Sequence, residues 1–252
     1  MTDTTTTQQQ NLYKILLIGD NCLDVYQYGT IDRISPEAPV PVFKFEYQES
    51  KPGMAGNVFN NLKNLGCVVD FIHNKTSTKT RLIDIKSKQH IVRIDDDQMS
   101  DSISVDLTTI NNYDAIVISD YNKGTVDIST IAVIAAHSKI PVFIDTKKTE
   151  LARINNAWIK INLSEYEKLK SSCENLIVTL GSLGARHNEK VYPSPKVEVS
   201  DVCGAGDTFL AALTVEFLRT HSIDNAIKFA NKASAVTVQH IGVYAPTFEE
   251  IK

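Results

Sequence analysis

The chain lacks an apolar run long enough to cross a membrane, for which about 20 consecutive apolar residues are needed. Its polar start also lacks the basic and apolar regions of a secretory signal peptide. We therefore expect a cytoplasmic protein with no membrane partner. Residues 1–12, rich in threonine and glutamine, are predicted to form a disordered tail ahead of one domain over 13–252.

Clusters of positive charge are missing as well. The 26 basic and 30 acidic residues give a net charge of −4, without a long basic run. Domains that bind nucleic acids carry basic faces, so we expect no nucleic-acid partner. The four cysteines form neither a C-x-x-C pair nor a zinc-ligand spacing, which predicts reduced thiols. No G-x-x-x-x-G-K-[ST] motif occurs, which argues against a P-loop kinase.

What the chain does contain is a series of short apolar runs, each followed by polar or glycine residues. The expected strands are 13–20, 68–73, 115–119, 141–144, 157–161 and 176–180. The expected helices are 58–66, 129–137, 209–218 and 223–240. Apolar strands that alternate with helices predict an α/β fold with a mostly parallel sheet covered on both faces. The polar residues after the strands then share one edge of the sheet, where ligands bind in such folds.

Two segments depart from this alternation. Prolines at positions 36, 39 and 41 exclude helix over 26–50, and β-branched and aromatic residues there favour strands. Residues 81–94 read as a hairpin. Together they predict a small β-sheet inserted into the main fold. The acids at 95–97 are expected to form a solvated turn rather than a metal site.

The stretch 201–209 carries the most specific chemistry. Gly204, Ala205 and Gly206 stand where a loop becomes a helix, so their N–H groups can point at one anion. Asp207 beside them is suited to take a proton from an attacking hydroxyl. A glycine-rich turn with an aspartate near a helix start is common, so both interpretations stay open for this stretch alone.

Four motifs in order then resemble the ribokinase-like (PfkB) carbohydrate kinases over nearly the whole chain. They are the segments 53–57, 162–165, 179–184 and 201–207. The resemblance implies a three-layer α/β/α sandwich whose small sheet is a lid over the sugar. It also implies a small-molecule sugar substrate, ATP and Mg²⁺ as cofactors, and a homodimer formed through the lid.

The resemblance also implies roles for individual residues. Asp207 is the expected base, and Gly204, Ala205 and Gly206 form the expected anion hole. The sugar hydroxyls are expected on Asp24, Gly53 and Asn57. The nucleotide site is expected at Thr179, Gly181, Gly184 and Asn231, and Mg²⁺ is expected to be organised by Asn162 and Glu165. From the residues alone, Asp24 reads equally as a turn or cap residue, and Asn57 as a helix cap.

Within this family the likeness is strongest to the kinases of heptose 7-phosphate, through the segments 34–42 and 119–124. A second phosphate must then be held, and Arg93, Lys123 and Lys147 are the cationic candidates. Met54 stands where the family usually has a second glycine, which bears on sugar specificity. The chain is also short after residue 73 and between 168 and 176, and we expect no nucleotidyltransferase domain after residue 252.

Three other functions are compatible with parts of the pattern. A kinase for another sugar or sugar phosphate, such as fructose or ribose, shares the same four motifs. A non-catalytic sugar- or nucleotide-binding protein needs no base, which the retained Asp207 and Glu165 argue against. A dinucleotide-dependent oxidoreductase is disfavoured because Phe209 occupies the third glycine position of its fingerprint.

Overall fold

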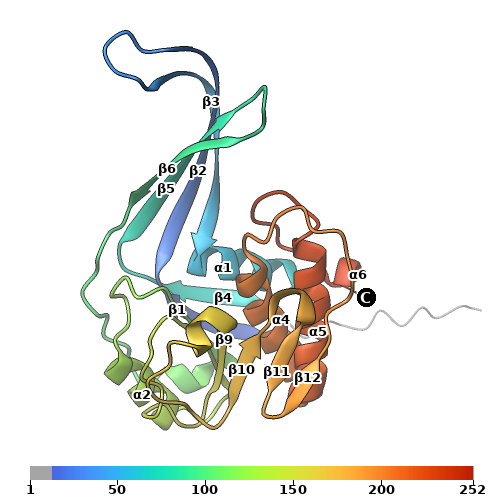
Figure 1. Cartoon of the computed structure of the whole chain (residues 1–252). Coiled ribbons are helices and arrows are strands. Elements are labelled where there is room, and N and C mark those ends of the chain that lie inside the picture. The colour runs from blue at the N-terminus through green and yellow to red at the C-terminus, as the bar shows by residue number, and fades with distance from the viewer. Residues whose placement is uncertain (1–12, 252) are drawn as a thin grey trace, which may run out of the picture.

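A computed structural model of the chain describes residues 13–251, so the expected tail over 1–12 lies outside the described residues. Within that range the strands form two sheets, and one of them projects away from the other (Figure 1). No helix among the described residues is long and apolar enough to span a bilayer.

The larger sheet has eight strands in the described range, in the order β12-β11-β10-β9-β8-β7-β1-β4. Its strands are β1 (Lys14–Gly19), β4 (Val68–Ile72), β7 (Ala115–Asp120), β8 (Val142–Thr146), β9 (Trp158–Asn162), β10 (Leu176–Thr179), β11 (Ala185–His187) and β12 (Lys190–Tyr192). The six strands from β4 to β10 pair in parallel, and β11 and β12 add an antiparallel edge.

Helices cover both faces of this sheet. They are α1 (Ala55–Asn64), α2 (Ile128–His137), α3 (Leu163–Tyr166), α4 (Ala205–Thr220), α5 (Ile223–Thr237) and α6 (Phe248–Ile251). Alternate residues of β1 point to opposite faces: Ile15 and Leu17 enter the core beneath α1, α4 and α5, while Leu16 and Ile18 enter the core beneath α2. Burial on both faces explains why these strands are continuously apolar. The predicted α/β fold with a mostly parallel sheet is therefore confirmed.

The smaller sheet has the order β3-β2-β5-β6. Its strands are β2 (Asn21–Ile34), β3 (Pro41–Met54), β5 (Thr76–Asp84) and β6 (His90–Asp96). Strands β2 and β5 pair in parallel and the outer pairs are antiparallel. Its strands account for most of the two ranges expected to form a lid, 26–50 and 81–94, apart from the loops 35–40 and 85–89, and they extend beyond both ranges. Because β2 starts two residues after β1 ends and β5 starts four residues after β4 ends, the base of this sheet is joined closely to the larger sheet, and β3 runs directly into α1.

Several local expectations differ from the structure. Asp95 and Asp96 end strand β6 and are not in a turn, because they pair with β5. The hairpin of β11 and β12 was not predicted, since three-residue strands are too short to show a periodicity. The run 196–200 ahead of the 201–209 stretch is expected to be extended; in the structure it pairs with no strand and runs along a cavity described below.

The connection between β9 and β10 contains one helical turn, α3, in place of a long crossover helix. This agrees with the expectation that the chain is short between 168 and 176. Leu169 and Cys173 from the same connection pack against the core beneath α2. The shortened segment thus covers part of the sheet face without a second helix.

We predict that Phe143→Ala lowers the free energy of unfolding by about 3–5 kcal/mol, because a large aromatic core side chain is lost. Phe143 on β8 is fully buried, and its ring centroid lies 5.4 Å from that of Phe217 on α4. Denaturant unfolding followed by circular dichroism measures the change. The control, Val133→Ala on the exposed side of α2, is expected to change stability by less than about 1 kcal/mol. An equal effect of both variants would contradict this account of the core.

Candidate active site

The predicted residues of the 201–207 segment gather at the carboxyl edge of the larger sheet, where α4 begins. Gly204 precedes the helix with φ 79° and ψ −5°, a left-handed conformation that glycine adopts without strain. A Cβ atom at this position would lie 2.7 Å from the Asn57 side-chain nitrogen. A larger residue would therefore displace the Asn57 amide, which donates to Asp207.

Asp207 lies in the first turn of α4 and is 5% exposed. Its carboxylate accepts two hydrogen bonds, from Asn57 Nδ2 at 2.9 Å and from the Tyr121 hydroxyl at 2.7 Å. Burial raises the pKa of the Asp207 carboxyl to about 6, and the two hydrogen bonds oppose this rise because they stabilise the charged form. A carboxylate with this pKa is ionised at neutral pH and can accept a proton.

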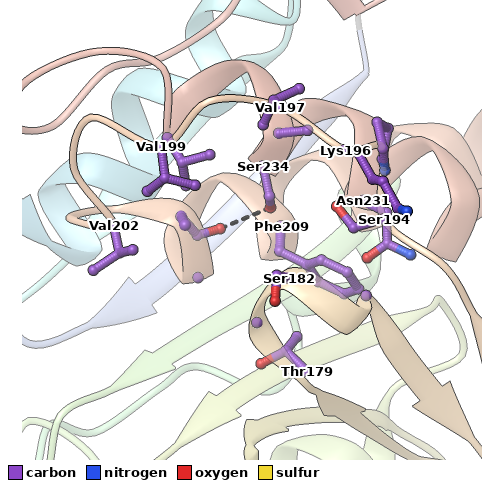
Figure 2. Close-up of a pocket in the computed structure, with 17 residues that line it drawn as sticks. Thr179, Ser182, Ser194, Lys196, Val197, Val199, Val202, Phe209, Asn231 and Ser234 are labelled. Atoms are coloured by element: carbon purple, nitrogen blue, oxygen red, sulfur yellow. Dashed lines mark hydrogen bonds between the residues drawn. The ribbon is translucent and has the colours of Figure 1, made fainter.

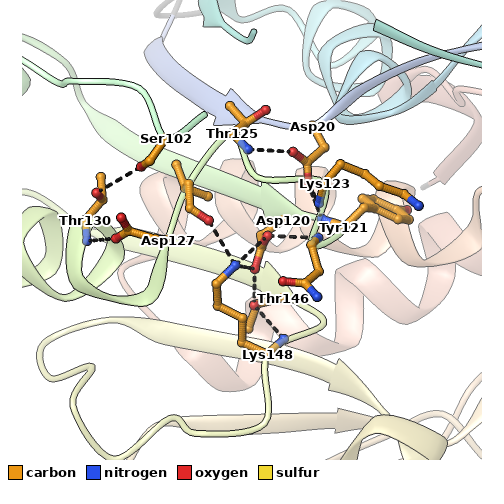
Figure 3. Close-up of polar contacts among 12 residues, drawn as sticks. Asp20, Ser102, Asp120, Tyr121, Lys123, Thr125, Asp127, Thr130, Thr146 and Lys148 are labelled. Carbon is orange, nitrogen blue, oxygen red and sulfur yellow. Dashed lines mark hydrogen bonds and ion pairs between the residues drawn. The ribbon is translucent and has the colours of Figure 1, made fainter. Parts of the chain in front are cut away.

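Tyr121 was not predicted as a site residue, although the segment that contains it was noted. The loop after β7 is held by Asp20, whose carboxylate accepts hydrogen bonds from the backbone N–H groups of Tyr121, Lys123 and Thr125 at 2.8, 3.0 and 3.1 Å (Figure 3). Asp20 is 1% exposed and follows β1 directly. The aspartate at the end of one strand thus fixes the loop that delivers the Tyr121 hydroxyl to Asp207.

A second buried carboxylate holds the next strand end in the same region. Asp120 at the end of β7 accepts a hydrogen bond from Thr146 Oγ1 at 2.5 Å and forms an ion pair with Lys148 at 2.8 Å (Figure 3). Lys148 also donates to the backbone carbonyl of Val126. These contacts join the ends of β7 and β8 and so fix the spacing of the loops above them.

A buried cation lies beside the predicted anion hole. Lys160 on β9 is 4% exposed and forms an ion pair with Asp145 at 2.7 Å. Its ammonium nitrogen is 2.8 Å from the position that a Cβ atom on Gly206 would take. The other carboxylate oxygen of Asp145, Oδ1, is buried and has no hydrogen-bond partner among the described residues. The Ala205 N–H donates to the Val202 carbonyl at 3.3 Å, so the remaining backbone donors at the N-terminus of α4, together with the Lys160 ammonium nearby, favour an anion.

A cavity of ≈ 490 Å³ opens beside this helix N-terminus (Figure 2). Its lining includes the four predicted nucleotide-site residues, Thr179, Gly181, Gly184 and Asn231, together with Ala205 and Gly206. Val197, Val199 and Val202 add apolar surface. Ser234 of α5 donates to the carbonyl of Ala205 at 2.9 Å, and this hydrogen bond joins α5 to the start of α4 at the cavity wall. The structure thus brings the predicted nucleotide residues together, next to the predicted anion hole.

Asn162 and Glu165 cap helix α3. The Glu165 N–H donates to Asn162 Oδ1 at 2.9 Å, and the Asn162 N–H donates to Glu165 Oε2 at 2.8 Å. The remaining Glu165 oxygen is bound by Lys147. No group of three or more His, Cys, Asp or Glu side chains within residues 13–251 is arranged to hold a metal ion. A metal ion bound here would therefore need ligands besides these protein side chains.

The residues predicted for the sugar occupy the base of the smaller sheet. Asp24 on β2 is 5% exposed and forms an ion pair with Arg81 at 2.6 Å. Gly53 lies on the neighbouring strand β3, opposite Cys22, and a Cβ atom on it would be 2.3 Å from Asp24 Oδ2. Asn57 follows in the first turn of α1 and reaches Asp207 as described above. These three residues therefore lie in a row between the smaller sheet and the Asp207 carboxylate.

The three predicted phosphate-binding cations are all engaged by carboxylates. Arg93 on the edge strand β6 binds Asp95 through two nitrogens, and Lys123 binds Asp97. Lys147 binds Glu165, and its ammonium lies 5.1 Å from the centroid of the Tyr121 ring. Of the three, Lys147 is thus beside the Asp207 region, whereas Arg93 contacts no other predicted site residue.

Met54 ends β3 and precedes α1 with φ 52° and ψ −131°. This backbone conformation is one that residues with a side chain rarely adopt. The structure therefore gives a physical reason for the expected glycine at this position. Met54 nevertheless keeps the glycine-like conformation, and its side chain is 6% exposed.

Comparisons with known proteins agree with one another. The sequence profile described as pfkB family carbohydrate kinase matches residues 54–250. The chain is 33% identical over 297 residues to the bifunctional protein HldE of a Nitratiruptor species, with 95% of this chain and 64% of that protein covered. It is 32% identical over 304 residues to the protein of the same name from Helicobacter pylori, with 94% and 65% covered. The chain thus spans less than two thirds of the length of these curated relatives.

A solved structure shows the same fold. The Arabidopsis thaliana ribokinase complexed with ribose and ATP superposes with a TM-score of 0.67 and 16% sequence identity. The superposition covers 96% of this chain and 98% of that one. The expected three-layer arrangement with a second, small sheet is therefore that of the ribokinases.

We predict that Tyr121→Phe raises the pKa of the Asp207 carboxyl by about one unit, the size expected when a hydrogen bond to a charged group is lost. Carbon-13 NMR of aspartate-labelled protein measures it, and Asp207→Asn identifies the resonance. Tyr113→Phe serves as the matched control, because that hydroxyl donates to Asp70 at 2.9 Å, away from this site. An unchanged Asp207 pKa in Tyr121→Phe would show that this hydrogen bond does not stabilise the carboxylate.

Proposed function

Because the chain belongs to the pfkB family of carbohydrate kinases, we propose that it transfers the terminal phosphoryl group of ATP to the C1 hydroxyl of D-glycero-D-manno-heptose 7-phosphate. The product is the 1,7-bisphosphate. The observation that carries the proposal is the buried Asp207 carboxylate, with a pKa of about 6, next to the donors at the start of α4.

In this proposal Asp207 is the general base. It accepts the proton of the attacking sugar hydroxyl while the oxygen forms its bond to phosphorus and the bond to the ADP leaving group breaks. Asn57 and Tyr121 orient the carboxylate through their hydrogen bonds. A base with a pKa near 6 is a stronger proton acceptor than an exposed aspartate and still ionised at pH 7.

Charge on the transferred group is met by the first turn of α4. The N–H groups of Gly204 and Gly206 supply hydrogen-bond donors, the Ala205 N–H would leave its 3.3 Å bond to the Val202 carbonyl to join them, and the Lys160 ammonium adds a positive charge beside them. Lys160 stays in place because Asp145 binds it. Such preorganised donors stabilise charge without reorganising during the reaction.

The cavity beside α4 is the proposed site for ATP. It adjoins the anion hole through Ala205 and Gly206, so a nucleotide placed there directs its phosphates at the helix N-terminus. Val197, Val199 and Val202 offer apolar contact for a base. The Arabidopsis thaliana ribokinase, which shares this fold, is complexed with ribose and ATP, and this supports ATP as the donor.

The residues also fit Mg²⁺ bound mainly through water and phosphate oxygens, which is the usual mode for this ion. The unpartnered Asp145 Oδ1 is buried near the anion hole and offers an acceptor to a metal-bound water. Asn162 and Glu165 would organise the same hydration shell. Bound Mg²⁺ would neutralise charge on the nucleotide phosphates.

The acceptor is proposed to lie between the smaller sheet and α1. Asp24, Gly53 and Asn57 offer polar groups and close approach for sugar hydroxyls. The smaller sheet then serves as the lid that excludes water, and we propose that two copies pair through it. Phe45 and Ile94 are more than half exposed on this sheet, which leaves apolar surface for such pairing.

The heptose 7-phosphate assignment has two supports. The segments 34–42 and 119–124 resemble the heptose 7-phosphate kinases, and both curated relatives carry the name HldE. Kinases of fructose, ribose or another sugar phosphate share the base and anion hole, and a binding protein shares the fold. The acceptor must therefore be decided by measurement.

We predict that Asp207→Asn retains ATP binding but loses at least about a hundredfold in turnover, because no base accepts the hydroxyl proton. ADP release in the presence of ATP and Mg²⁺ measures turnover, and calorimetry measures ATP binding. Asp106→Asn, an exposed carboxylate that binds Thr108, is the control and is expected to behave as the wild type.

The same assay with a panel of sugars and sugar phosphates tests the acceptor. We expect the highest kcat/KM with heptose 7-phosphate. Activity on fructose or ribose alone would show that the acceptor is one of these sugars and not heptose 7-phosphate. Absence of turnover on every compound, with ATP still bound, would favour a non-catalytic binding protein.

A further inference from the structure

Lys51 forms an ion pair with no carboxylate among residues 13–251. It lies on β3 directly opposite Asp24 of β2, so both side chains are on the same face of the smaller sheet. Asp24 is engaged by Arg81, and the Lys51 side chain forms no ion pair or hydrogen bond with any residue in 13–251. Its one described contact is with the Tyr26 ring, whose centroid is 6.0 Å from the ammonium nitrogen.

Tyr26 adds a second donor on the same face. It lies two residues after Asp24 on β2 and is 7% exposed. Its ring is flanked by Lys51 on one side and by the Arg81 guanidinium, 5.2 Å from the centroid, on another. Burial raises the pKa of the Tyr26 hydroxyl, so it remains a protonated donor. Within the described chain this hydroxyl donates to no residue, which leaves it available to a ligand.

The two donors converge beside the loop that follows α5. A Cβ atom on Gly242 would lie 3.5 Å from the Tyr26 hydroxyl and 3.6 Å from the Lys51 ammonium. The next residue, Val243, contacts the Gly204 position at the anion hole, at 3.2 Å from a Cβ built there. Adjacent residues of one loop therefore lie close to the Lys51 and Tyr26 donors and to the start of α4.

An ammonium and a hydroxyl without acceptors suit an anionic ligand group. The alternative cations are less available, because Arg93, Lys123 and Lys147 would each have to leave a carboxylate to bind a phosphate. Arg81 is likewise held by Asp24. Lys51 needs no such exchange.

We propose that Lys51 and Tyr26 bind the phosphate of a sugar phosphate acceptor, at the end of the sugar far from the hydroxyl that attacks ATP. This inference rests on the proposed kinase function and makes its acceptor class specific. A phosphate held here and a hydroxyl held at Asp207 fix both ends of the acceptor, with Asp24 and Asn57 between them.

The test is Lys51→Met, assayed with heptose 7-phosphate and with the same heptose lacking the phosphate. We expect KM for the phosphorylated sugar to rise about tenfold to a hundredfold, the range for one lost charge-assisted hydrogen bond. KM for the unphosphorylated sugar and for ATP should stay within about twofold. Tyr26→Phe should raise the same KM by a smaller factor.

Lys79→Met is the matched comparison, because Lys79 lies opposite Asp24 on the other neighbouring strand, β5, and on the same face. It should leave KM for heptose 7-phosphate unchanged. If Lys79→Met raises that KM and Lys51→Met does not, the assignment of the phosphate to Lys51 is wrong. An equal rise in KM for both sugars in Lys51→Met would also overturn it.

Binding measured without turnover separates this inference from the kinase proposal. Calorimetric titration of Asp207→Asn with heptose 7-phosphate, with and without Lys51→Met added, reports on the phosphate site alone. A wild type that binds heptose 7-phosphate through Lys51 but transfers no phosphoryl group would refute the kinase and keep the site. A kinase whose Asp207→Asn form binds equally with and without Lys51 would keep the kinase and refute the site.

Discussion

The Asp207 carboxylate is the interaction on which the rest of the site depends, because it joins three segments that are far apart in the chain. It belongs to α4, accepts one hydrogen bond from α1 through Asn57, and accepts another from the loop after β7 through Tyr121. A buried carboxylate without partners costs several kcal/mol, so these donors have to be present for the acid to stay ionised. Close contact of α1 with α4 at Gly204 provides the first donor, and the Asp20 carboxylate provides the second by holding the loop.

Two opposing effects set the chemistry of this acid. Burial favours the neutral form and raises its pKa, while the donors favour the charged form and limit the rise to a value of about 6. An aspartate with more donors would be a weaker base, and one with none would be protonated at neutral pH. Beside the anion hole, the ion pair with Asp145 holds the Lys160 ammonium in place.

The sequence predicted the parts of this arrangement that lie within continuous motifs. Asp207, the glycines before it and the cavity residues Thr179 and Gly181 were found because each motif occupies one loop at a strand end. The contact between Tyr121 and Asp207 spans 86 positions, and no local pattern indicates it. Lys160 is a charged residue inside a buried strand, which indicates that it has a partner. The sequence does not identify that partner, because Asp145 lies on a neighbouring strand. The role proposed for Lys51 had no sequence signal either, since the pairing of Arg93, Lys123 and Lys147 with carboxylates is set by tertiary contacts.

Asp20 connects the larger sheet to both donors of the base. Its side chain holds the N–H of Tyr121, and its backbone carbonyl accepts a hydrogen bond from Ala55, the first residue of α1, at 3.0 Å. Met54 stands directly before Ala55 in a conformation that favours glycine. Burial of its side chain offsets strain in the backbone, and the hydrogen bond to Asp20 keeps the first turn of α1 in place. Methionine at position 54 is therefore compatible with a correctly placed Asn57. We expect the Met54 side chain to affect the space between the smaller sheet and α1 rather than the Asp207 carboxylate.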